Sequence, residues 1–367
     1  MATSFPIQKL PYLVLNKVVG LMANIERLAL LLTSKKTESL VLSLKFPNDK
    51  VHTIYFAEGS CGFMASILVS DHGENATPIK FDCSLRNGAG RNEEMNAIQK
   101  WCDVEGDFIK RAQTIYTKIQ KLFPVSGLSL RLNYLSTESV ERILAAPEFN
   151  HWWEVYTSGN IQPDAIKLIM DHASPQRRII CDSEVKLPID FCHPNAFAFK
   201  VAKYFVATWA SLDQLLAIRY VDVIGLGQTG LRCDDVNVLL HKFLETGYQM
   251  CNELEISVTG GIDVDALTED LLTFKVVNGV YTTFFLCTPT ATNSKIAKVF
   301  ISPNRIIINI GANEDDFLEA RRLLTLIRTR NRIQEEMNAG EMRQMEIEQV
   351  EREINEAEQV LMAAMAE

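Results

Sequence analysis

The chain has 367 residues, of which 47% are hydrophobic and 23% are charged, and its net charge at pH 7 is −9. This length and composition are typical of a globular protein of two or three units that needs neither disulfides nor metals. The acidic balance argues against nucleic acid as a partner, and Lys17, Glu26 and Arg27 interrupt the apolar stretch 12–32, which argues against a membrane span.

The first 45 residues are predicted to form three short helices. Pro11 suits the first turn of a helix, because its missing N–H is not needed there, and Ser34 can cap the third helix. The first two helices each carry apolar residues at i, i+3, i+4 and i+7, which is one helical face: Leu15, Val18, Val19 and Met22, then Ile25, Leu28, Ala29 and Leu32.

These helices carry more apolar residues than one face can bury. Further apolar positions lie outside the two main stripes, namely Leu13, Val14, Leu21, Leu30 and Leu31. Helices that are apolar on more than one face are covered from more than one side. The segment therefore needs the rest of the chain or a partner to cover the surplus.

Residues 40–86 are predicted to be extended and to form a β-meander. Turn residues such as Pro47-Asn48 and His72-Gly73 separate four apolar runs, 41–44, 52–56, 63–69 and 79–83. An amphipathic helix is then predicted over 107–122, with its apolar residues at helical spacing.

From residue 127 onward, short strands alternate with helices. Strands are predicted at 128–132, 152–156, 178–182, 219–224 and 254–258. Helices are predicted after Ser136, over 163–173, within 197–216, and from Asp234 or Asp235 to Leu244. The alternation indicates a largely parallel sheet with helices against it. The fold class is therefore α/β (α+β overall), and this part resembles a short leucine-rich-repeat stack.

Two hairpins are predicted to close the body of the chain. Asn278-Gly279 separates the apolar runs 274–277 and 281–286, and Pro303-Asn304 separates 297–301 from 306–310. Asn-Gly between two such runs is a strong hairpin signal.

One motif points to an enzyme. Gly225, Gly227 and Gly230 match G-x-G-x-x-G after an apolar strand, a pattern that in dinucleotide-binding proteins places a pyrophosphate at a helix N-terminus. Here the helix is predicted to start later, at Asp234-Asp235, where two carboxylates would repel a phosphate. We interpret the motif as a flexible loop, and a nucleotide-binding enzyme that uses these glycines is the alternative.

The remaining candidates for chemistry are few. The eight cysteines form no C-x-x-C pair, and none of the six histidines lies at zinc spacing from a cysteine, so neither a metal site nor a cofactor is predicted. Free thiols and the lack of a secretory signal pattern predict a cytoplasmic or nuclear protein. Trp152 and Trp153 are candidates for substrate binding, because neighbours on a strand face opposite sides and one of them is expected in the core.

Residues 313–367 are predicted to form a long acidic helix. This tail carries 14 acidic and 7 basic residues in 314–367, and no proline interrupts it. Apolar residues recur every seven positions, which is typical of a short coiled coil, at Leu326, Ile333, Ile347, Ile354 and Leu361, and Gly340 interrupts the row between Ile333 and Ile347. A solvated helix and self-association through residues 326–365 both remain open.

Two parts of the sequence resemble one family. Phe5–Leu15, with its Leu10-Pro11 followed by aliphatic residues, resembles the opening of an F-box, and Ser34–Thr37 resembles the Ser-Lys-Lys/Arg segment after the second F-box helix. Residues 211–216, 234–244 and 254–257 resemble the F-box-associated domain of the nematode-type F-box family. This chain departs from the family at Ala23-Asn24, where Asp-Pro is frequent, and at Leu31-Leu32, where Leu-Ser is frequent.

The resemblance implies a substrate-recruiting adaptor of an SCF (Skp–cullin–F-box) ubiquitin ligase, and not an enzyme. It implies an F-box domain over 1–45, a substrate-recognition domain over 46–312 and a helical tail over 313–367. The residues implied to contact a Skp-type adaptor, some of which must instead form the internal core, are Leu10, Pro11, Val14, Leu15, Val18, Met22, Ile25, Leu28 and Leu32. The protein substrate is not identified by the sequence. A scaffold that associates through its C-terminal helix without joining a ligase is the further alternative.

Overall fold

The computed structural model describes residues 10–22, 24–44, 50–59, 62–71, 79–82, 106–245, 250–278, 281–289, 295–303, 305–311, 317–338 and 343–366. The chain divides into two compact units, Met1–Val185 and Lys186–Glu367, called here the N-terminal unit and the C-terminal unit. The boundaries predicted at 45/46 and 312/313 fall outside the described residues and stay predictions.

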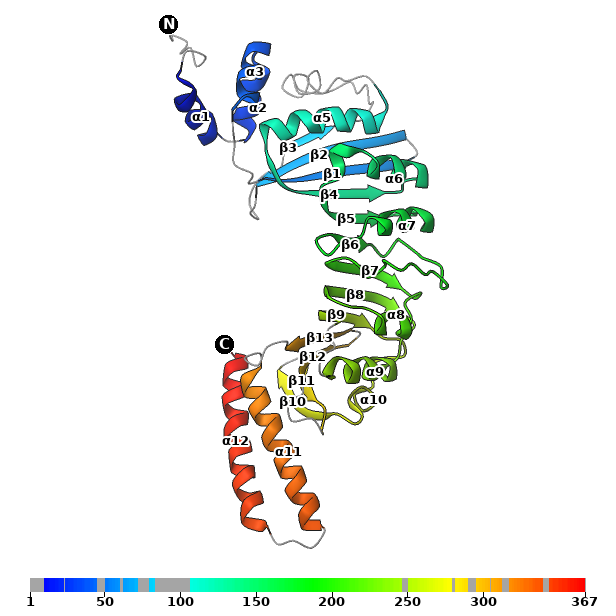
Figure 1. The fold of residues 1–367 in the computed structure, drawn as a ribbon, viewed down its shortest axis with the longest axis vertical. Coiled ribbons are helices and arrows are strands. Elements are labelled where there is room, and N and C mark those ends of the chain that lie inside the picture. The colour runs from blue at the N-terminus through cyan, green and yellow to red at the C-terminus, as the bar shows by residue number, and fades with distance from the viewer. Residues whose placement is uncertain are drawn as a thin grey trace. The chain divides into compact units, whose positions relative to one another are not determined.

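The N-terminal unit contains a mixed sheet with helices packed on one face (Figure 1). Its strands are β1 (Lys50–Gly59), β2 (Gly62–Asp71), β3 (Ile79–Asp82), β4 (Val125–Asn133), β5 (Trp152–Ser158) and β6 (Arg178–Cys181). They lie in the order β6-β5-β4-β1-β2-β3. The strands β1, β2 and β3 pair antiparallel, as the predicted meander requires, and β1, β4, β5 and β6 pair in parallel.

Six helices of the N-terminal unit are described, together with the short helix η2 (Pro147–Phe149). They are α1 (Tyr12–Leu21), α2 (Asn24–Leu32), α3 (Lys35–Leu42), α5 (Phe108–Leu122), α6 (Thr137–Leu144) and α7 (Pro163–Asp171). Asp107 caps α5 by accepting hydrogen bonds from the amides of Ile109 and Lys110, and Ser136 caps α6 in the same way. The apolar stripe of α5 packs on the sheet, where the ring of Phe108 contacts that of Phe56.

The strands of the C-terminal unit, called here the C-terminal sheet, are parallel at first and continue as antiparallel hairpins. Its strands are β7 (Val201–Ala207), β8 (Val221–Thr229), β9 (Cys251–Ser257), β10 (Leu272–Asn278), β11 (Tyr281–Cys287), β12 (Ile296–Ser302) and β13 (Arg305–Gly311). They lie in the order β7-β8-β9-β13-β12-β11-β10. Both predicted hairpins, β10–β11 and β12–β13, are confirmed by their pairing.

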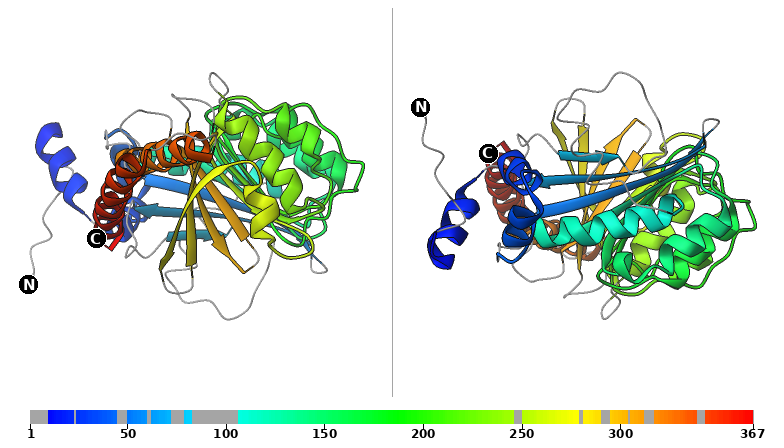
Figure 2. Two further views of the ribbon diagram at one scale, coloured as in Figure 1. Left: turned by 90° about the horizontal axis from the view of Figure 1, so that it is seen from below. Right: turned by 90° about the horizontal axis from the view of Figure 1, so that it is seen from above.

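Helices cover both faces of the C-terminal sheet to different extents. The helices on one face are α8 (Leu212–Leu216), α9 (Cys233–Leu244) and α10 (Val264–Thr268) (Figures 1 and 2). The opposite face carries a hairpin of two helices, α11 (Leu318–Asn338) and α12 (Gln344–Ala366), that packs over β10 and β11. The part of this face that α11 and α12 leave uncovered is called the open face.

The hairpin of α11 and α12 is where the predicted C-terminal helix lies. A long helix is present, and the described residues place two, which pack against each other. Four positions of the predicted heptad stripe, Ile333, Ile347, Ile354 and Leu361, are buried. Ile354 and Leu361 join a core with Leu323 of α11 and Phe285 of β11.

The mixed α/β class is confirmed, as is a helix within 197–216, but two local predictions are wrong and one strand was missed. Val41 and Leu42 continue helix α3, because Val41 is buried on the inner face of that helix. Part of 197–216 forms strand β7 before helix α8 begins, because 201–207 pairs in parallel with β8. Helix α9 is preceded by Arg232, and Asp235 accepts a hydrogen bond from the Arg232 amide inside its first turn.

Candidate binding surfaces

The N-terminal helices have a small internal core. Leu15 and Val19 of α1, Leu28 and Leu31 of α2 and Val41 of α3 are buried. The hydroxyl of Ser34 accepts a hydrogen bond from the Thr37 amide at 3.1 Å and so caps α3, as predicted.

Arg27 joins α2 to the end of α1. Its Nε donates to the carbonyl oxygen of Val19 at 3.0 Å, and its Nη2 donates to that of Gly20 at 2.7 Å. These carbonyls belong to the last turn of α1, where the carbonyl oxygens lack the usual amide donors within the helix. The Val19 oxygen also accepts a hydrogen bond from the amide of Met22 at 3.2 Å. A cation is also favourable at the C-terminus of a helix. Arg27 therefore fixes the orientation of α1 relative to α2.

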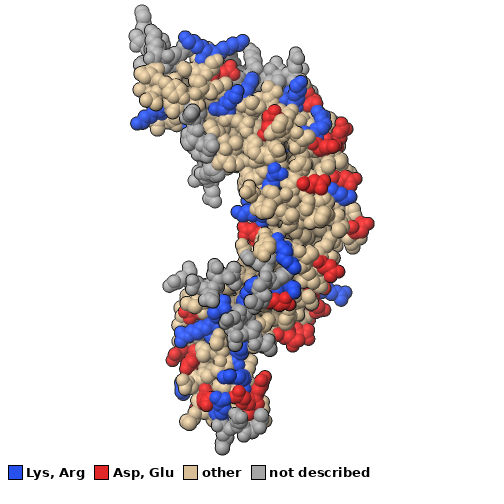
Figure 3. All heavy atoms as spheres, viewed as in Figure 1, with Lys and Arg blue, Asp and Glu red and all other residues tan. Residues whose placement is uncertain are grey.

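The outer side of α1 is apolar and exposed. Leu13 and Leu21 are 80% and 81% exposed, and Val14 and Val18 are also exposed. Val14, Val18 and Leu21 lie at i, i+4 and i+7 and so share a face. Figure 3 shows mostly uncharged atoms over this helical segment. None of these side chains belongs to the buried residues of the three helices.

The nine residues implied to contact an adaptor are divided by the structure. Leu15 and Leu28 are buried in the internal core, and Pro11, Val14 and Val18 are exposed. Leu10, Met22 and Leu32 are half-buried, and the side chain of Ile25 lies outside the described residues. Leu13 and Leu21 were absent from that set, although their surplus apolar character was visible in the sequence.

The second surface is the face of the N-terminal sheet opposite α5, α6 and α7. Its centre is Glu154, which is only 7% exposed. The carboxylate accepts hydrogen bonds from the hydroxyl of Ser129 at 3.0 Å and from Nη2 of Arg131 at 3.1 Å. Nη1 of Arg178 lies 3.5 Å from its other oxygen. Two guanidinium groups and a hydroxyl thus compensate for the loss of water around this charge.

Aromatic side chains complete this network. The guanidinium of Arg131 lies 4.5 Å from the ring centre of Tyr156, and the Tyr156 hydroxyl donates a hydrogen bond to Asp182. Burial, together with that hydrogen bond, raises the pKa of Tyr156 to about 12. The phenol therefore stays protonated, and the network holds its charges in fixed pairs.

The two candidate tryptophans lie in different surroundings. Trp152 is buried in the core with the Arg177 guanidinium 4.2 Å from its ring centre. Trp153 is half-buried, packs over Gly127 and lies 5.2 Å from the Arg178 guanidinium. Trp153 is thus the member of the pair that borders the polar network.

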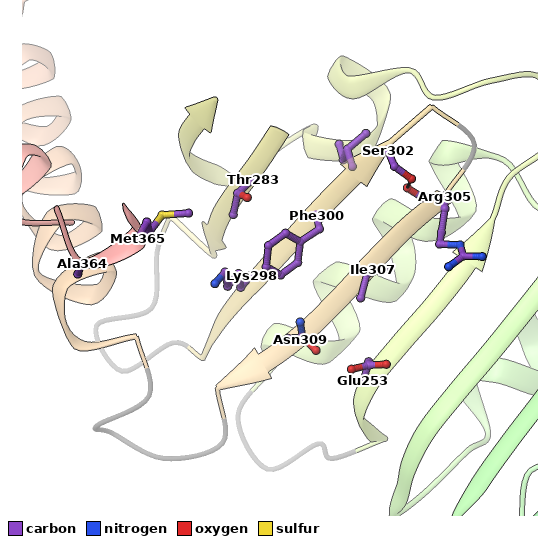
Figure 4. Close-up of a pocket in the computed structure, with 11 residues that line it drawn as sticks. Glu253, Thr283, Lys298, Phe300, Ser302, Arg305, Ile307, Asn309, Ala364 and Met365 are labelled. Atoms are coloured by element: carbon purple, nitrogen blue, oxygen red, sulfur yellow. Dashed lines mark hydrogen bonds between the residues drawn. The ribbon is translucent and has the colours of Figure 1, made fainter. Parts of the chain in front are cut away.

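The third surface is a pocket of about 870 Å³ in the C-terminal unit (Figure 4). It lies on the open face of β9, β11, β12 and β13, and the last turns of α12 supply one wall through Ala364 and Met365. Phe300 and Ile307, which are paired across β12 and β13, form the apolar floor.

The pocket also contains a row of polar side chains. Lys298 pairs with Asn309 across β12 and β13, and Asn309 pairs with Glu253 across β13 and β9. The Nζ of Lys298 lies 4.7 Å from the ring centre of Phe300. Partial burial lowers the pKa of Lys298. No single strand carries this row, so sequence reasoning missed it.

Arg305 differs from Lys298 in having a partner. Its Nη1 lies 2.9 Å from Glu255, which is also 3.9 Å from Nζ of Lys203. Within the described part of the chain, neither Lys298 nor Glu253 takes part in an ion pair. The pocket therefore holds one cation and one anion that are free to interact with a ligand.

The glycine motif does not form a loop, contrary to our interpretation of the sequence. Gly225 and Gly227 lie inside strand β8, and Gly230 follows its end. A Cβ atom on Gly227 would lie 2.1 Å from the carbonyl oxygen of Phe205 on β7. The glycine is thus required by the close approach of two strand backbones.

The thiols of Cys181 and Cys251 are not set up for nucleophilic chemistry. Burial raises the pKa of both Cys181 and Cys251 to about 12.

Among the residues that the structure describes, no group of three histidine, cysteine, aspartate or glutamate side chains could hold a metal ion. No described helix is both long and apolar enough to cross a membrane.

Comparisons with known proteins give no relative. No protein-family model matches the chain, and neither the curated proteins nor the solved structures contain a match. The three surfaces are therefore interpreted from their own geometry.

Proposed function

We propose that this protein is a substrate-recruiting adaptor of an SCF-type ubiquitin ligase. The observation that carries the proposal is the outer side of α1, where Leu13 and Leu21 are about four-fifths exposed while Leu15 and Val19 of the same helix are buried. Contiguous apolar surface rimmed by polar residues marks a protein interaction site. The Leu10-Pro11 and Ser34–Thr37 resemblances favour a Skp-type adaptor as the partner.

In this proposal the N-terminal helices and the two sheets have separate tasks. Helix α1 packs against the Skp-type adaptor, and Arg27 keeps it in the required orientation. The α/β body that follows these helices in the chain resembles an F-box-associated domain, and it presents a protein substrate. The chain itself makes and breaks no covalent bond, because ubiquitin transfer occurs on other subunits. Such a protein works in the cytoplasm or nucleus.

The test is co-purification of the full-length chain with a Skp-type adaptor. The double variant Leu13→Glu/Leu21→Glu should lose the adaptor, because two charges in the centre of an apolar interface must be desolvated without partners. Both side chains are exposed in the free protein, so its thermal midpoint should stay unchanged.

Val238→Glu is the matched control, because Val238 is an exposed apolar residue on a helix of the C-terminal unit. This variant should bind the adaptor as the wild type does. Equal binding by the wild type and the double variant, or no binding by the wild type, would refute the proposal. Arg27→Ala should weaken binding while leaving the outer side of α1 chemically intact.

A further inference from the structure

The pocket of the C-terminal unit contains two charges, Lys298 and Glu253, that are not consumed by an ion pair with a described residue, although the Lys298 ammonium lies over the Phe300 ring. Lys298 and Glu253 stand on either side of Asn309, and neither forms an ion pair with another described residue. We propose that this pocket binds an extended peptide segment that carries one acidic and one basic side chain two residues apart. Lys298 would pair with the acidic group and Glu253 with the basic group.

The spacing of the row fits such a segment. Lys298, Asn309 and Glu253 lie on three adjacent strands, and neighbouring strands are about 4.8 Å apart, so the row spans about 10 Å. In an extended peptide, side chains two residues apart point to the same side and are separated by about 7 Å. The flexible side chains of lysine and glutamate can cover the difference.

Asn309 suits the backbone of the bound segment. A peptide group that leaves water must keep hydrogen-bond partners for its N–H and its carbonyl oxygen. The side-chain amide of Asn309 offers both a donor and an acceptor, and it lies between the two charges. A segment whose charges are held by Lys298 and Glu253 thus has a peptide group within reach of Asn309.

The floor and the size of the pocket suit a peptide better than a folded surface. Phe300, Ile307 and the wall residue Met365 present apolar surface to the aliphatic parts of the segment (Figure 4). A volume of about 870 Å³ is in the range of sites that enclose small ligands. It can hold a few side chains.

The charges decide which peptide is favoured. A segment with only acidic groups would place one of them near Glu253, and a segment with only basic groups would place one near Lys298. Like charges brought together in this way oppose binding. Arg305 adds little to either case, because Glu255 already pairs with it at 2.9 Å. The pocket therefore selects mixed charge.

That the peptide belongs to a ligase substrate rests on the proposed adaptor function. That the pocket binds such a peptide does not depend on this function. Substrate recruitment by an F-box protein needs a surface away from the N-terminal helices. The pocket lies in the other unit, on residues 253–309 and 364–365.

The experiment measures binding of short fluorescein-labelled peptides to the full-length protein by fluorescence anisotropy. The peptides share leucine and glycine flanks and differ in a three-residue core: acid–leucine–base, base–leucine–acid, acid–leucine–acid and base–leucine–base. We expect at least one mixed-charge peptide to bind about tenfold more tightly than both single-charge peptides.

Variants test the two charges directly. Lys298→Glu should weaken binding of the mixed-charge peptide about tenfold, and the double variant Lys298→Glu/Glu253→Lys should restore binding of a mixed-charge peptide in one order or the other. Lys275→Glu is the matched control. Lys275 is exposed on β10 and pairs with Phe284, on the sheet face opposite to the pocket, so this variant should bind as the wild type does.

Three results would overturn the proposal. They are that no peptide of the panel binds, that the doubly acidic or doubly basic peptide binds most tightly, or that Lys298→Glu behaves like Lys275→Glu. Co-purification with the Skp-type adaptor on the same variants tests the proposed function separately, because none of these substitutions touches α1. Failure of the peptide-binding test therefore leaves the adaptor proposal standing, and failure of the adaptor test leaves the peptide site standing.

Discussion

The two sheets treat their ionisable side chains differently. The N-terminal sheet buries two of them: His52 lies on the face covered by α5, and Glu154 lies on the opposite face within a network of arginine and serine donors. The C-terminal sheet leaves them half-buried, with Glu255 in partly exposed ion pairs and with Lys298 and Glu253 unpaired among the described residues.

This difference shows where each unit can interact with other molecules. A buried charge needs partners from its own chain, and once these are in place it has little left for a ligand. A half-buried charge without a partner costs less and still attracts an opposite charge. Ionisable groups in the N-terminal unit therefore matter for stability, and those in the pocket matter for binding.

The largest effect is expected from His52 at acidic pH. Burial lowers the pKa of this imidazole to about 4, with a further contribution from nearby His151. Because the unfolded chain binds a proton near pH 6.5 and the folded chain does not, stability is fully present above pH 6.5 and falls as the pH drops towards 4. The loss from this group should reach about 3 kcal/mol.

Urea unfolding of the wild type and of His52→Leu at several pH values between 7 and 4 measures this term. The wild type should lose more stability on acidification than the variant does. If stability depends on pH equally in the wild type and in the variant, folding does not lower the pKa of His52. The contrast between the two sheets would then lose one of its two supports.

Glu154→Ala should give the next largest effect. Removal of this carboxylate leaves Arg131 and Arg178 without their shared partner, and we expect a loss of about 2 kcal/mol in the free energy of unfolding. Glu255→Ala is the counterpart in the C-terminal sheet. Its pairs are more exposed, and its loss should stay below about 1 kcal/mol. Similar losses in guanidinium unfolding of the two variants would remove the distinction.

A smaller effect is expected from the strand glycines. Gly227→Ala places a Cβ atom against the backbone of Phe205, and the required shift of two strands should cost about 1 to 2 kcal/mol. Gly230→Ala meets its nearest atom at 3.9 Å and should change the unfolding free energy by less than about 0.5 kcal/mol. Thermal unfolding of both variants distinguishes a packed strand from the predicted loop, for which the two losses would be alike.

Local patterns in the sequence predicted most single elements. The apolar run 63–69, the helix over 107–122, the Ser136 cap and the hairpin of 274–277 with 281–286 all rest on neighbours within a few residues, and each is confirmed. Strand β7 was missed because 197–207 is apolar at almost every position, and only its pairing with β8 distinguishes it from a helix.

The sites were harder to predict than the elements. Lys298, Asn309 and Glu253 are brought together by pairing of β13 with both β12 and β9, and β9 precedes β13 by about 50 residues. No spacing rule along the chain reveals such a row. The outer side of α1 was partly visible as surplus apolar residues, but which of them point outward depends on how α1 packs on α2.

The hydrogen bonds of Arg27 have a consequence for the order in which the protein loosens. Among the described residues, helix α1 is held by the buried Leu15 and Val19, by the Arg27 guanidinium and by one hydrogen bond from the Tyr12 hydroxyl to the Ser43 carbonyl oxygen. The sheet strands, in contrast, are held by continuous ladders. Regions with few buried contacts open locally at a lower free energy than the core does. Helix α1 can therefore detach and return while the sheets stay folded, and a partner that binds its outer side would close this local opening without altering the rest of the molecule.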